Sequence, residues 1–295
     1  MALFAGLAAF PITPADADGR VDTAALRRLV RRLVEAGVDG VGLLGSTGTY
    51  AYLTRAERRR AIEAAVDEAG GRVPVMAGVG ALRTDEAAAL ASDAKAAGAA
   101  AGLLAPVSYT PLTDAEVLEH FRAVAGDSGL PICIYNNPAV THFTFSAELE
   151  QRLAAIPGVI GVKNPAPPAA EVGAHLADLR GRVPAGFSLG YSVDANAAEA
   201  MIAGADLWHS VLAGLLPAPV LAVVRAARAG DAAQARRLNA GLAPIWALFA
   251  ELTGLRVAYA AANALGLAAA APPRPILPLD AAQTARVAAA FRALA

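Results

Sequence analysis

The stretch Val159-Ile160-Gly161-Val162-Lys163-Asn164-Pro165 is an apolar run that ends in a lysine. Its β-branched residues favour a strand, and its lack of polar alternation is typical of a strand that helices cover on both faces. Similar runs recur along the chain, and we predict further strands at Gly6–Thr13, Val38–Gly45, Val73–Gly80, Ala99–Pro106, Pro131–Asn137, Gly186–Tyr191 and Asp206–Leu212. The sequence therefore predicts a parallel sheet.

The segments between these runs carry the signals of helices. Thr23 opens a predicted helix over Thr23–Ala36, and Thr54 with Glu57 has the spacing of a capping box. Further predicted helix starts lie at Thr84, Thr113-Asp114 and Ser146, and predicted helix ends lie at Gly37 and Gly98. Strands and helices thus alternate along the chain.

Eight strands, each followed by a helix, over about 230 residues predict a (β/α)8 barrel, the TIM barrel. A doubly wound open sheet is the alternative. The remaining stretch, 231–295, is predicted to form further helices, interrupted by Gly254, Gly266 and the segment Pro272–Pro278. We therefore predict a catalytic barrel domain over 1–230 and a C-terminal helical extension over 231–295.

Composition argues against several classes of function. Of the 295 residues 56% are hydrophobic and 17% are charged, and the net charge is −1, which provides no basic field for nucleic acid. No apolar window of about 18 residues lacks charge, Gly or Pro in the way a membrane span requires. The first residues carry no basic segment of a secretory signal. We expect a cytoplasmic protein without nucleic-acid or membrane partners.

Lys163 is the first candidate for a catalytic residue. Lysine occurs only at positions 95 and 163, whereas arginine supplies the rest of the 25 cationic side chains. A guanidinium does not readily lose its proton, but a desolvated amine does and can then attack a carbonyl to form a Schiff base. The alternative is an ordinary strand-end lysine that reaches water. Because barrel enzymes place their chemistry at the C-terminal ends of the strands, the position of Lys163 favours the reactive interpretation.

Other polar groups follow predicted strands at equivalent positions. Gly45-Ser46-Thr47-Gly48 offers hydroxyl and amide groups that could hold an anion, although such a string is also a common turn. Tyr135, in Tyr135-Asn136-Asn137-Pro138, could exchange protons with a bound intermediate or could be a core aromatic residue. Tyr109, in the loop after the fourth strand, is either a surface residue or a second hydroxyl donor.

Metal and thiol chemistry have little support in the sequence. The four histidines are scattered without paired-ligand spacing, and His142 is the one that we place nearest to the candidate site. Cys133, the single cysteine, lies in a predicted strand and is interpreted as a buried thiol rather than a nucleophile. We expect no metal and no organic cofactor.

These motifs, taken in order, resemble the dihydrodipicolinate synthase / N-acetylneuraminate lyase family of class I aldolases. The similarity runs from about Gly6 to Leu279. Its landmarks are Pro11-Ile12-Thr13-Pro14, Asp18-Gly19-Arg20-Val21-Asp22, Gly45-Ser46-Thr47-Gly48, Tyr135-Asn136-Asn137-Pro138, Gly161-Val162-Lys163, Gly190 and Pro275-Ile276-Leu277-Pro278-Leu279. The resemblance implies a (β/α)8 barrel that usually assembles as a homotetramer, a dimer of dimers.

The resemblance also implies roles for individual residues. Lys163 would form a Schiff base with pyruvate or another 2-keto acid, and Tyr135 would move protons to and from the imine. Tyr109 would correspond to a second tyrosine, which a neighbouring subunit can supply. The expected substrate-binding residues are Ser46, Thr47, Gly48 and Gly190, and Thr47 is also expected to take part in catalysis.

Three positions depart from the family pattern that the resemblance implies. Thr49 stands where Glu is common, and Asn164 stands where an acidic residue is common. Dihydrodipicolinate synthases carry an arginine that grips the second substrate's carboxylate, and Val140 occupies that position. We therefore expect a family member that is not itself a dihydrodipicolinate synthase.

Several functions remain open at this point. The first is a Schiff-base lyase or aldolase that acts on pyruvate or on a 2-keto-3-deoxy sugar acid. The alternatives are a Schiff-base dehydratase or hydratase of a keto sugar acid, dihydrodipicolinate synthase itself, and a non-catalytic binder of keto acids.

Overall fold

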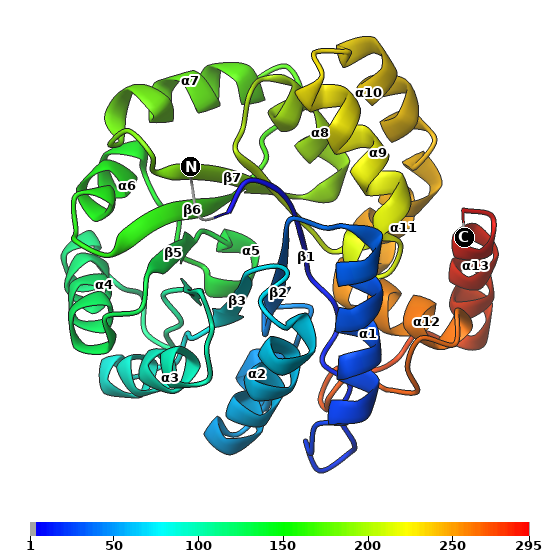
Figure 1. Cartoon of the computed structure of the whole chain (residues 1–295), viewed down its shortest axis with the longest axis horizontal. Coiled ribbons are helices and arrows are strands. Elements are labelled where there is room, and N and C mark those ends of the chain that lie inside the picture. Colours follow the sequence, from blue (N-terminus) through cyan, green and yellow to red (C-terminus); the bar gives the residue numbers. More distant parts are fainter. Residues whose placement is uncertain (1–3, 295) are drawn as a thin grey trace.

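The computed structural model describes residues 4–294, and within them eight parallel strands form a closed barrel in chain order (Figure 1). The barrel closes because β8 pairs with β1 as well as with β7. The strands are β1 (Gly6–Ala9), β2 (Gly40–Leu43), β3 (Val75–Gly78), β4 (Ala101–Leu104), β5 (Ile132–Tyr135), β6 (Val159–Pro165), β7 (Ser188–Ser192) and β8 (Leu207–Ser210). The predicted fold is confirmed, and the doubly wound open sheet is excluded.

Helices surround the barrel and continue beyond it. Those that follow the strands are α1 (Thr23–Ala36), α2 (Arg55–Ala69), α3 (Thr84–Ala96), α4 (Asp114–Ser128), α5 (Pro138–Thr141), α6 (Ala147–Ala154), α7 (Val172–Arg182), α8 (Asp194–Ile202) and α9 (Pro217–Arg228). The C-terminal helices are α10 (Ala232–Ala240), α11 (Ala243–Leu252), α12 (Gly254–Ala264) and α13 (Ala281–Arg292). The C-terminal helical extension is therefore present, and the domain division at residue 230 stays a prediction.

Most of the helix signals in the sequence are confirmed. Thr113 and Glu116 form a capping box at the start of α4, and the Ser146 hydroxyl accepts from an amide in the first turn of α6. α3 begins at Thr84, and Gly37 ends α1 with a left-handed φ of 81°. These local signals decide where helices start and stop because the end groups lack partners inside the helix.

Two capping details differ from the prediction. α1 covers Thr23–Ala36, but its cap is Asp22, whose carboxylate accepts from the helix's first turn. In the predicted capping box, the Glu57 carboxylate would accept a hydrogen bond from the Thr54 backbone amide. It accepts instead from the Val21 amide at 2.8 Å. A contact between distant parts of the chain thus replaces the local one.

The barrel interior is a small hydrophobic core that is separate from the one between sheet and helices. Its members are Phe4, Ala8, Phe10, Met76, Ala101, Leu103, Ala105, Cys133, Tyr135 and Leu207. Burial raises the pKa of the Cys133 thiol to about 12, so the interpretation of this residue as a buried, inert thiol is confirmed.

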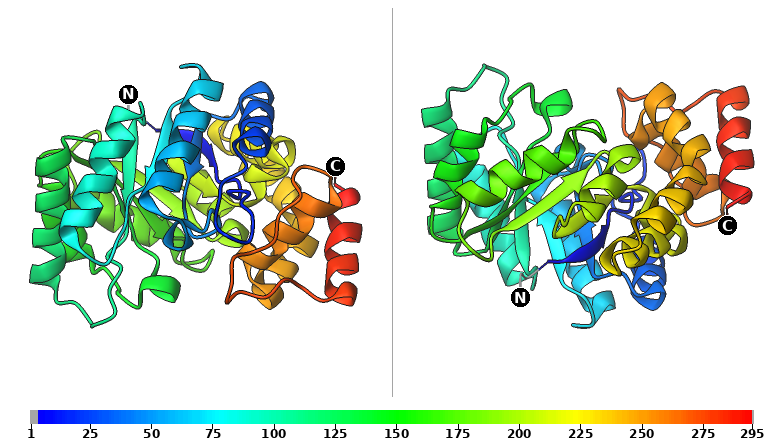
Figure 2. Two further views of the ribbon diagram at one scale, coloured as in Figure 1. Left: turned by 90° about the horizontal axis from the view of Figure 1, so that it is seen from below. Right: turned by 90° about the horizontal axis from the view of Figure 1, so that it is seen from above.

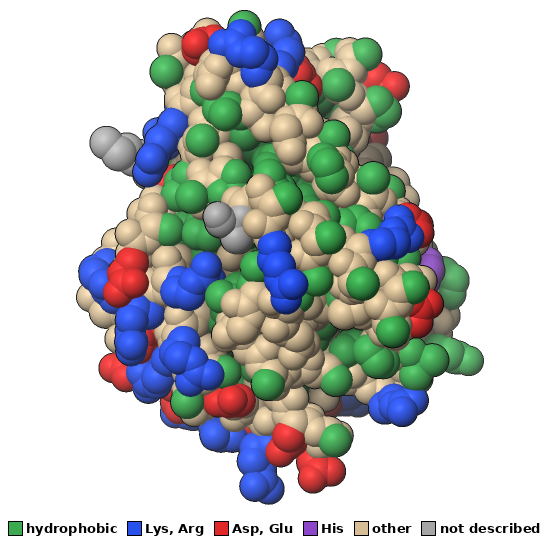
Figure 3. All heavy atoms as spheres, turned by 90° about the vertical axis from the view of Figure 1, so that its right-hand side faces the viewer, with side chains coloured by type: hydrophobic (Ala, Val, Ile, Leu, Met, Phe, Trp, Pro, Cys, Tyr) green, Lys and Arg blue, Asp and Glu red, His purple; other side chains and the backbone are tan. Residues whose placement is uncertain are grey.

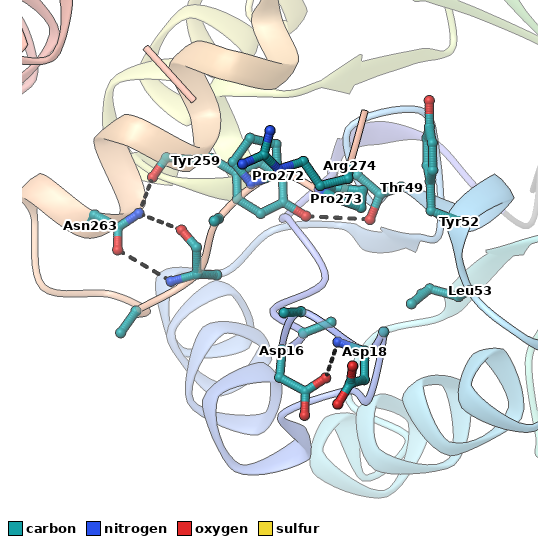
Figure 4. Close-up of a pocket in the computed structure, with 16 residues that line it drawn as sticks. Asp16, Asp18, Thr49, Tyr52, Leu53, Tyr259, Asn263, Pro272, Pro273 and Arg274 are labelled. Atoms are coloured by element: carbon teal, nitrogen blue, oxygen red, sulfur yellow. Dashed lines mark hydrogen bonds between the residues drawn. The ribbon is translucent and has the colours of Figure 1, made fainter. Parts of the chain in front are cut away.

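The C-terminal helices gather on one side of the barrel (Figures 1 and 2). Tyr259 of α12 ties this group to the strand ends. Its hydroxyl lies 3.3 Å from the Thr49 hydroxyl (Figure 4) and donates to the Thr13 carbonyl oxygen at 3.4 Å. The extension therefore packs against the C-terminal end of the barrel, where the loops after β1 and β2 lie.

On the side of the molecule that bears α13, hydrophobic side chains lie among scattered charged ones (Figure 3). In the part of the chain that the structure describes, no helix combines the length and the apolar character needed to cross a bilayer.

The turn after β2 depends on a glycine in the neighbouring strand. Leu44 has a positive φ of 55°, which is rare for a residue with a large side chain. A Cβ added at Gly78 would lie 1.8 Å from the Leu44 carbonyl oxygen. Gly78 therefore lets the chain turn sharply toward Ser46 and Thr47.

We expect the substitution Gly78→Ala to destabilise the protein by about 2–3 kcal/mol or more, because neither the strand nor the turn can move away from the added methyl group. Thermal unfolding followed by circular dichroism measures the effect. Gly126→Ala is the control, since nothing lies within 4 Å of the added atom in this helix, and it should be neutral or stabilising. Equal melting temperatures for the two variants would contradict the close approach.

Candidate active site

Lys163 lies on β6 and lines a cavity of about 580 Å³ at the C-terminal end of the barrel. Only 4% of the residue is exposed, so its amine does not reach bulk water as a snorkelling lysine would. The Nζ atom lies 3.9 Å from the ring centre of Phe10 and 4.3 Å from that of Tyr135. These aromatic faces favour a positive charge at that nitrogen.

Tyr135 is the strand neighbour of Lys163, because the two residues pair in the register of β5 and β6. Its hydroxyl lies 2.9 Å from the Ser46 hydroxyl and accepts from the Asn137 amide at 3.0 Å, and that amide also donates to Ser46 at 3.1 Å. Burial by itself would raise the pKa of Tyr135, but the Lys163 charge and these hydrogen bonds outweigh it and lower the pKa. The hydroxyl is therefore well placed to exchange a proton beside the amine.

The turn after β2 brings Ser46 and Thr47 to the same cavity. Gly48 lies behind them and does not line it. A Cβ at Gly48 would lie 2.9 Å from the Leu44 amide nitrogen, so this residue serves the tight turn. The close approach explains why a glycine is needed here, and the contact of Gly48 with substrate stays a prediction.

Gly190 is next to Lys163 in the sheet, but it does not line the cavity either. A Cβ at Gly190 would lie 2.4 Å from His209 Nε2. Gly190 therefore makes room for a histidine, and its contact with substrate stays a prediction.

His209 is the site residue that sequence reasoning missed. It points into the barrel from β8 and lines the cavity, with 2% of the residue exposed and no hydrogen-bond partner on either ring nitrogen within residues 4–294. Burial, and then the Lys163 charge, hold its pKa well below the usual value, so the ring is neutral. The strand alternation that points Leu207 inward also points His209 inward, and this was the available signal.

His142, which the sequence placed nearest to the candidate site, follows Val140 by two residues. His142 ends α5 with a positive φ of 57° and does not line the cavity. Tyr109 also lies outside the site, because 98% of it is exposed in the loop after β4. Within residues 4–294, the Tyr109 side chain does not line the cavity that contains Lys163.

The three departures from the family pattern have distinct surroundings. Thr49 bonds to Tyr259, as described above, and Val140 lines the cavity from α5 with 55% of the residue exposed. Asn164 is buried beside Asn136, whose amide donates to the Asn164 side-chain oxygen at 2.8 Å. Only Val140 therefore faces the space in which a second substrate could lie.

A buried carboxyl group lies behind the reactive pair. Glu150 of α6 is 2% exposed and accepts hydrogen bonds from the side chains of Asn136 and Asn164, at 3.4 and 3.1 Å. These two residues directly follow Tyr135 and Lys163 in the chain. Burial raises the pKa of Glu150 to about 7, although both amides lower it in part.

The outer wall of the cavity comes from the C-terminal helices. α11 contributes Trp246, Phe249 and Ala250, and the start of α12 contributes Thr253–Arg256. Sequence reasoning assigned these residues to the C-terminal helical extension and named none of them as site residues. A second cavity, of about 650 Å³, lies on the other side of Tyr259 and Thr49 (Figure 4). It contains none of the reactive groups described above.

Comparison with known proteins gives a consistent result. A model of the dihydrodipicolinate synthetase family matches residues 3–294. The 4-hydroxy-tetrahydrodipicolinate synthase of Thiobacillus denitrificans is 38% identical over 282 residues, which cover 95% of this chain and 94% of the relative.

Solved structures agree with this match. The crystal structure of dihydrodipicolinate synthase from Agrobacterium tumefaciens is 58% identical, with a TM-score of 0.97 and 99% of each chain covered. The chloride-inhibited dihydrodipicolinate synthase from Acinetobacter baumannii, complexed with pyruvate, is 29% identical, with a TM-score of 0.88 and 98% of each chain covered.

The names of these relatives bear on the expectation, based on Val140, that the protein is not itself a dihydrodipicolinate synthase. They do not support excluding dihydrodipicolinate synthase activity, because relatives across nearly the full length carry that name. With a buried lysine at the mouth of a closed parallel barrel and a family match over almost every residue, the chain belongs to the dihydrodipicolinate synthetase family and is a lyase of the class I aldolase type.

Proposed function

We propose that this protein forms a Schiff base between Lys163 and pyruvate and then joins the bound pyruvate to an aldehyde, or cleaves such a product in reverse. The observation that carries the proposal is the buried Lys163 amine beside the hydrogen-bonded Tyr135 hydroxyl. The names of the relatives support the condensing direction, and the Acinetobacter relative complexed with pyruvate supports the keto acid.

The reaction begins at the amine nitrogen. Unprotonated Lys163 attacks the keto carbon of pyruvate, and the keto oxygen leaves as water, so that a protonated imine remains. The rings of Phe10 and Tyr135 stabilise the positive nitrogen. Loss of a proton from the methyl carbon gives an enamine, whose carbon attacks the aldehyde, and hydrolysis of the new imine releases the product and restores the amine.

Tyr135 is the proposed proton carrier for these steps. Its lowered pKa and its contact with Ser46 let it give a proton to the carbinolamine oxygen and take it back. Ser46 and Thr47, with amides of their turn, are proposed to hold the pyruvate carboxylate. Tyr109 could act only from a second copy of the chain, in the proposed homotetramer.

A second candidate is a Schiff-base aldolase or dehydratase of a keto sugar acid. Val140 favours it, because an apolar side chain cannot replace the bidentate carboxylate grip of an arginine. Analysis of the products from 2-keto-3-deoxy sugar acids separates the cases. Release of pyruvate and an aldehyde indicates the aldolase, and loss of water alone indicates the dehydratase.

Borohydride reduction in the presence of pyruvate tests the proposed covalent step. We expect one adduct, on Lys163, to appear in peptide mass spectrometry. Lys163→Arg should abolish both the adduct and turnover, because arginine cannot form the imine. Lys95→Arg is the matched control, since it replaces the only other lysine, and it should leave both unchanged. An adduct on Lys95, or none with the wild type, would refute the proposal.

Tyr135→Phe keeps the ring that faces Lys163 and removes only the hydroxyl. We expect kcat to fall by roughly 10²–10⁴-fold, because the variant loses the hydroxyl that is proposed to carry the proton beside Lys163. Steady-state kinetics measures the loss. Borohydride trapping of the imine that forms slowly between Lys163 and pyruvate shows that the lysine remains reactive. Full activity in the variant would assign proton transfer to another group.

Glu150→Gln tests the buried carboxyl group. Since the pKa of Glu150 is raised from 4.5 to about 7, the folded protein holds a proton that the unfolded chain has lost. Wild-type stability should therefore fall as pH rises from about 5 to 7, by on the order of 1–3 kcal/mol, and the variant should lack this loss. Melting temperatures between pH 5 and 8 measure it, with exposed Glu148→Gln as the control. Parallel curves would contradict the raised pKa.

A further inference from the structure

The start of α12 forms part of the wall around the reactive lysine. Thr253, Gly254, Leu255 and Arg256 all line the same cavity as Lys163. No side chain caps this helix, whose first turn contains Arg256. A cation in the first turn faces the positive end of the helix dipole, which is unfavourable unless an anion lies nearby.

Arg256 lacks an acidic partner. Its Nη1 donates to the Thr253 hydroxyl at 3.2 Å, and within residues 4–294 no carboxylate lies within 4.0 Å of its guanidinium. By contrast, Arg286 of the neighbouring α13 is paired with Glu251 of α11. Arg256 is half-buried, so its charge is only partly screened by water.

The other charged groups of the cavity do not neutralise Arg256. Asp194 is the acidic residue that lines it, but the carboxylate already accepts from Trp208 Nε1 at 2.6 Å and from the amides of Val211 and Leu212 at 3.0 and 2.9 Å. His209 is neutral, as described above. The cavity therefore presents two cationic side chains, Lys163 and Arg256, in a wall that is otherwise largely apolar.

We propose that Arg256 is a specificity-determining residue that binds a second acid group, distant from the keto carbon, on the molecule attached to Lys163. The preferred ligands are then 2-oxo acids with a distal carboxylate, and the preferred aldehydes carry an acid group. This inference rests on the proposed Schiff-base function. It also accounts for Val140, because the carboxylate grip that is missing from α5 is supplied from α12.

Paired 2-oxo acids that differ only in the distal group provide the test. 2-Oxoglutarate is compared with 2-oxopentanoate, and 2-oxoadipate with 2-oxohexanoate, by the concentration that half-saturates borohydride trapping of Lys163. Pyruvate, which has no second acid group, is the internal reference. In the wild type we expect at least one diacid to half-saturate at roughly a 10–100-fold lower concentration than its monoacid partner.

Arg256→Met should remove this preference, and Arg256→Lys should keep part of it, because an ammonium retains the charge without the planar fork. Arg286→Met is the control and should behave as the wild type. The inference is overturned if the wild type prefers no diacid, or if the preference survives in Arg256→Met. Trapping with pyruvate but without a diacid preference refutes only the inference, whereas no trapping with pyruvate removes the proposed function as well.

Discussion

The position of one amine in an apolar, closed barrel determines the chemistry of this protein. Lys163 Nζ lies against the faces of Phe10 and Tyr135. Tyr135 is on the neighbouring strand β5, whereas Phe10 follows β1 and reaches the amine across the interior of the closed barrel. A free amine condenses with a ketone, and a neighbouring hydroxyl can carry the protons that this step requires. An open sheet would not bring β1 next to β8 and would leave this end of the molecule exposed.

Small residues make this crowding possible. Gly78 has no side chain and so leaves room for the Leu44 carbonyl group. The chain can therefore turn so that Ser46 approaches the Tyr135 hydroxyl. Gly190 leaves room for the His209 ring in the same way. The hydroxyls and the neutral imidazole therefore surround the amine without adding negative charge, which would compete with an anionic substrate for the lysine.

The C-terminal helices complete the site from outside the barrel. Tyr259 holds α12 to the loop after β2, and the same helix carries Arg256 to the cavity wall. Lys163 lies on the strand side of the cavity and Arg256 on the helix side, so a ligand attached to Lys163 shares its cavity with Arg256. Substitutions in α11 and α12 can therefore change which substrates fit the cavity without altering the strands that carry Lys163 and Tyr135.

The sequence alone was enough to predict the order of strands, the barrel and the place of Lys163 at a strand end. Continuous apolar runs indicate buried parallel strands, and a lone lysine at a strand end stands out chemically. The positions of His209 and Arg256 in the cavity wall, the burial of Glu150 and the exposure of Tyr109 were decided only by the tertiary structure. Each depends on segments far apart in the chain meeting in space, and local residue patterns do not encode such distances.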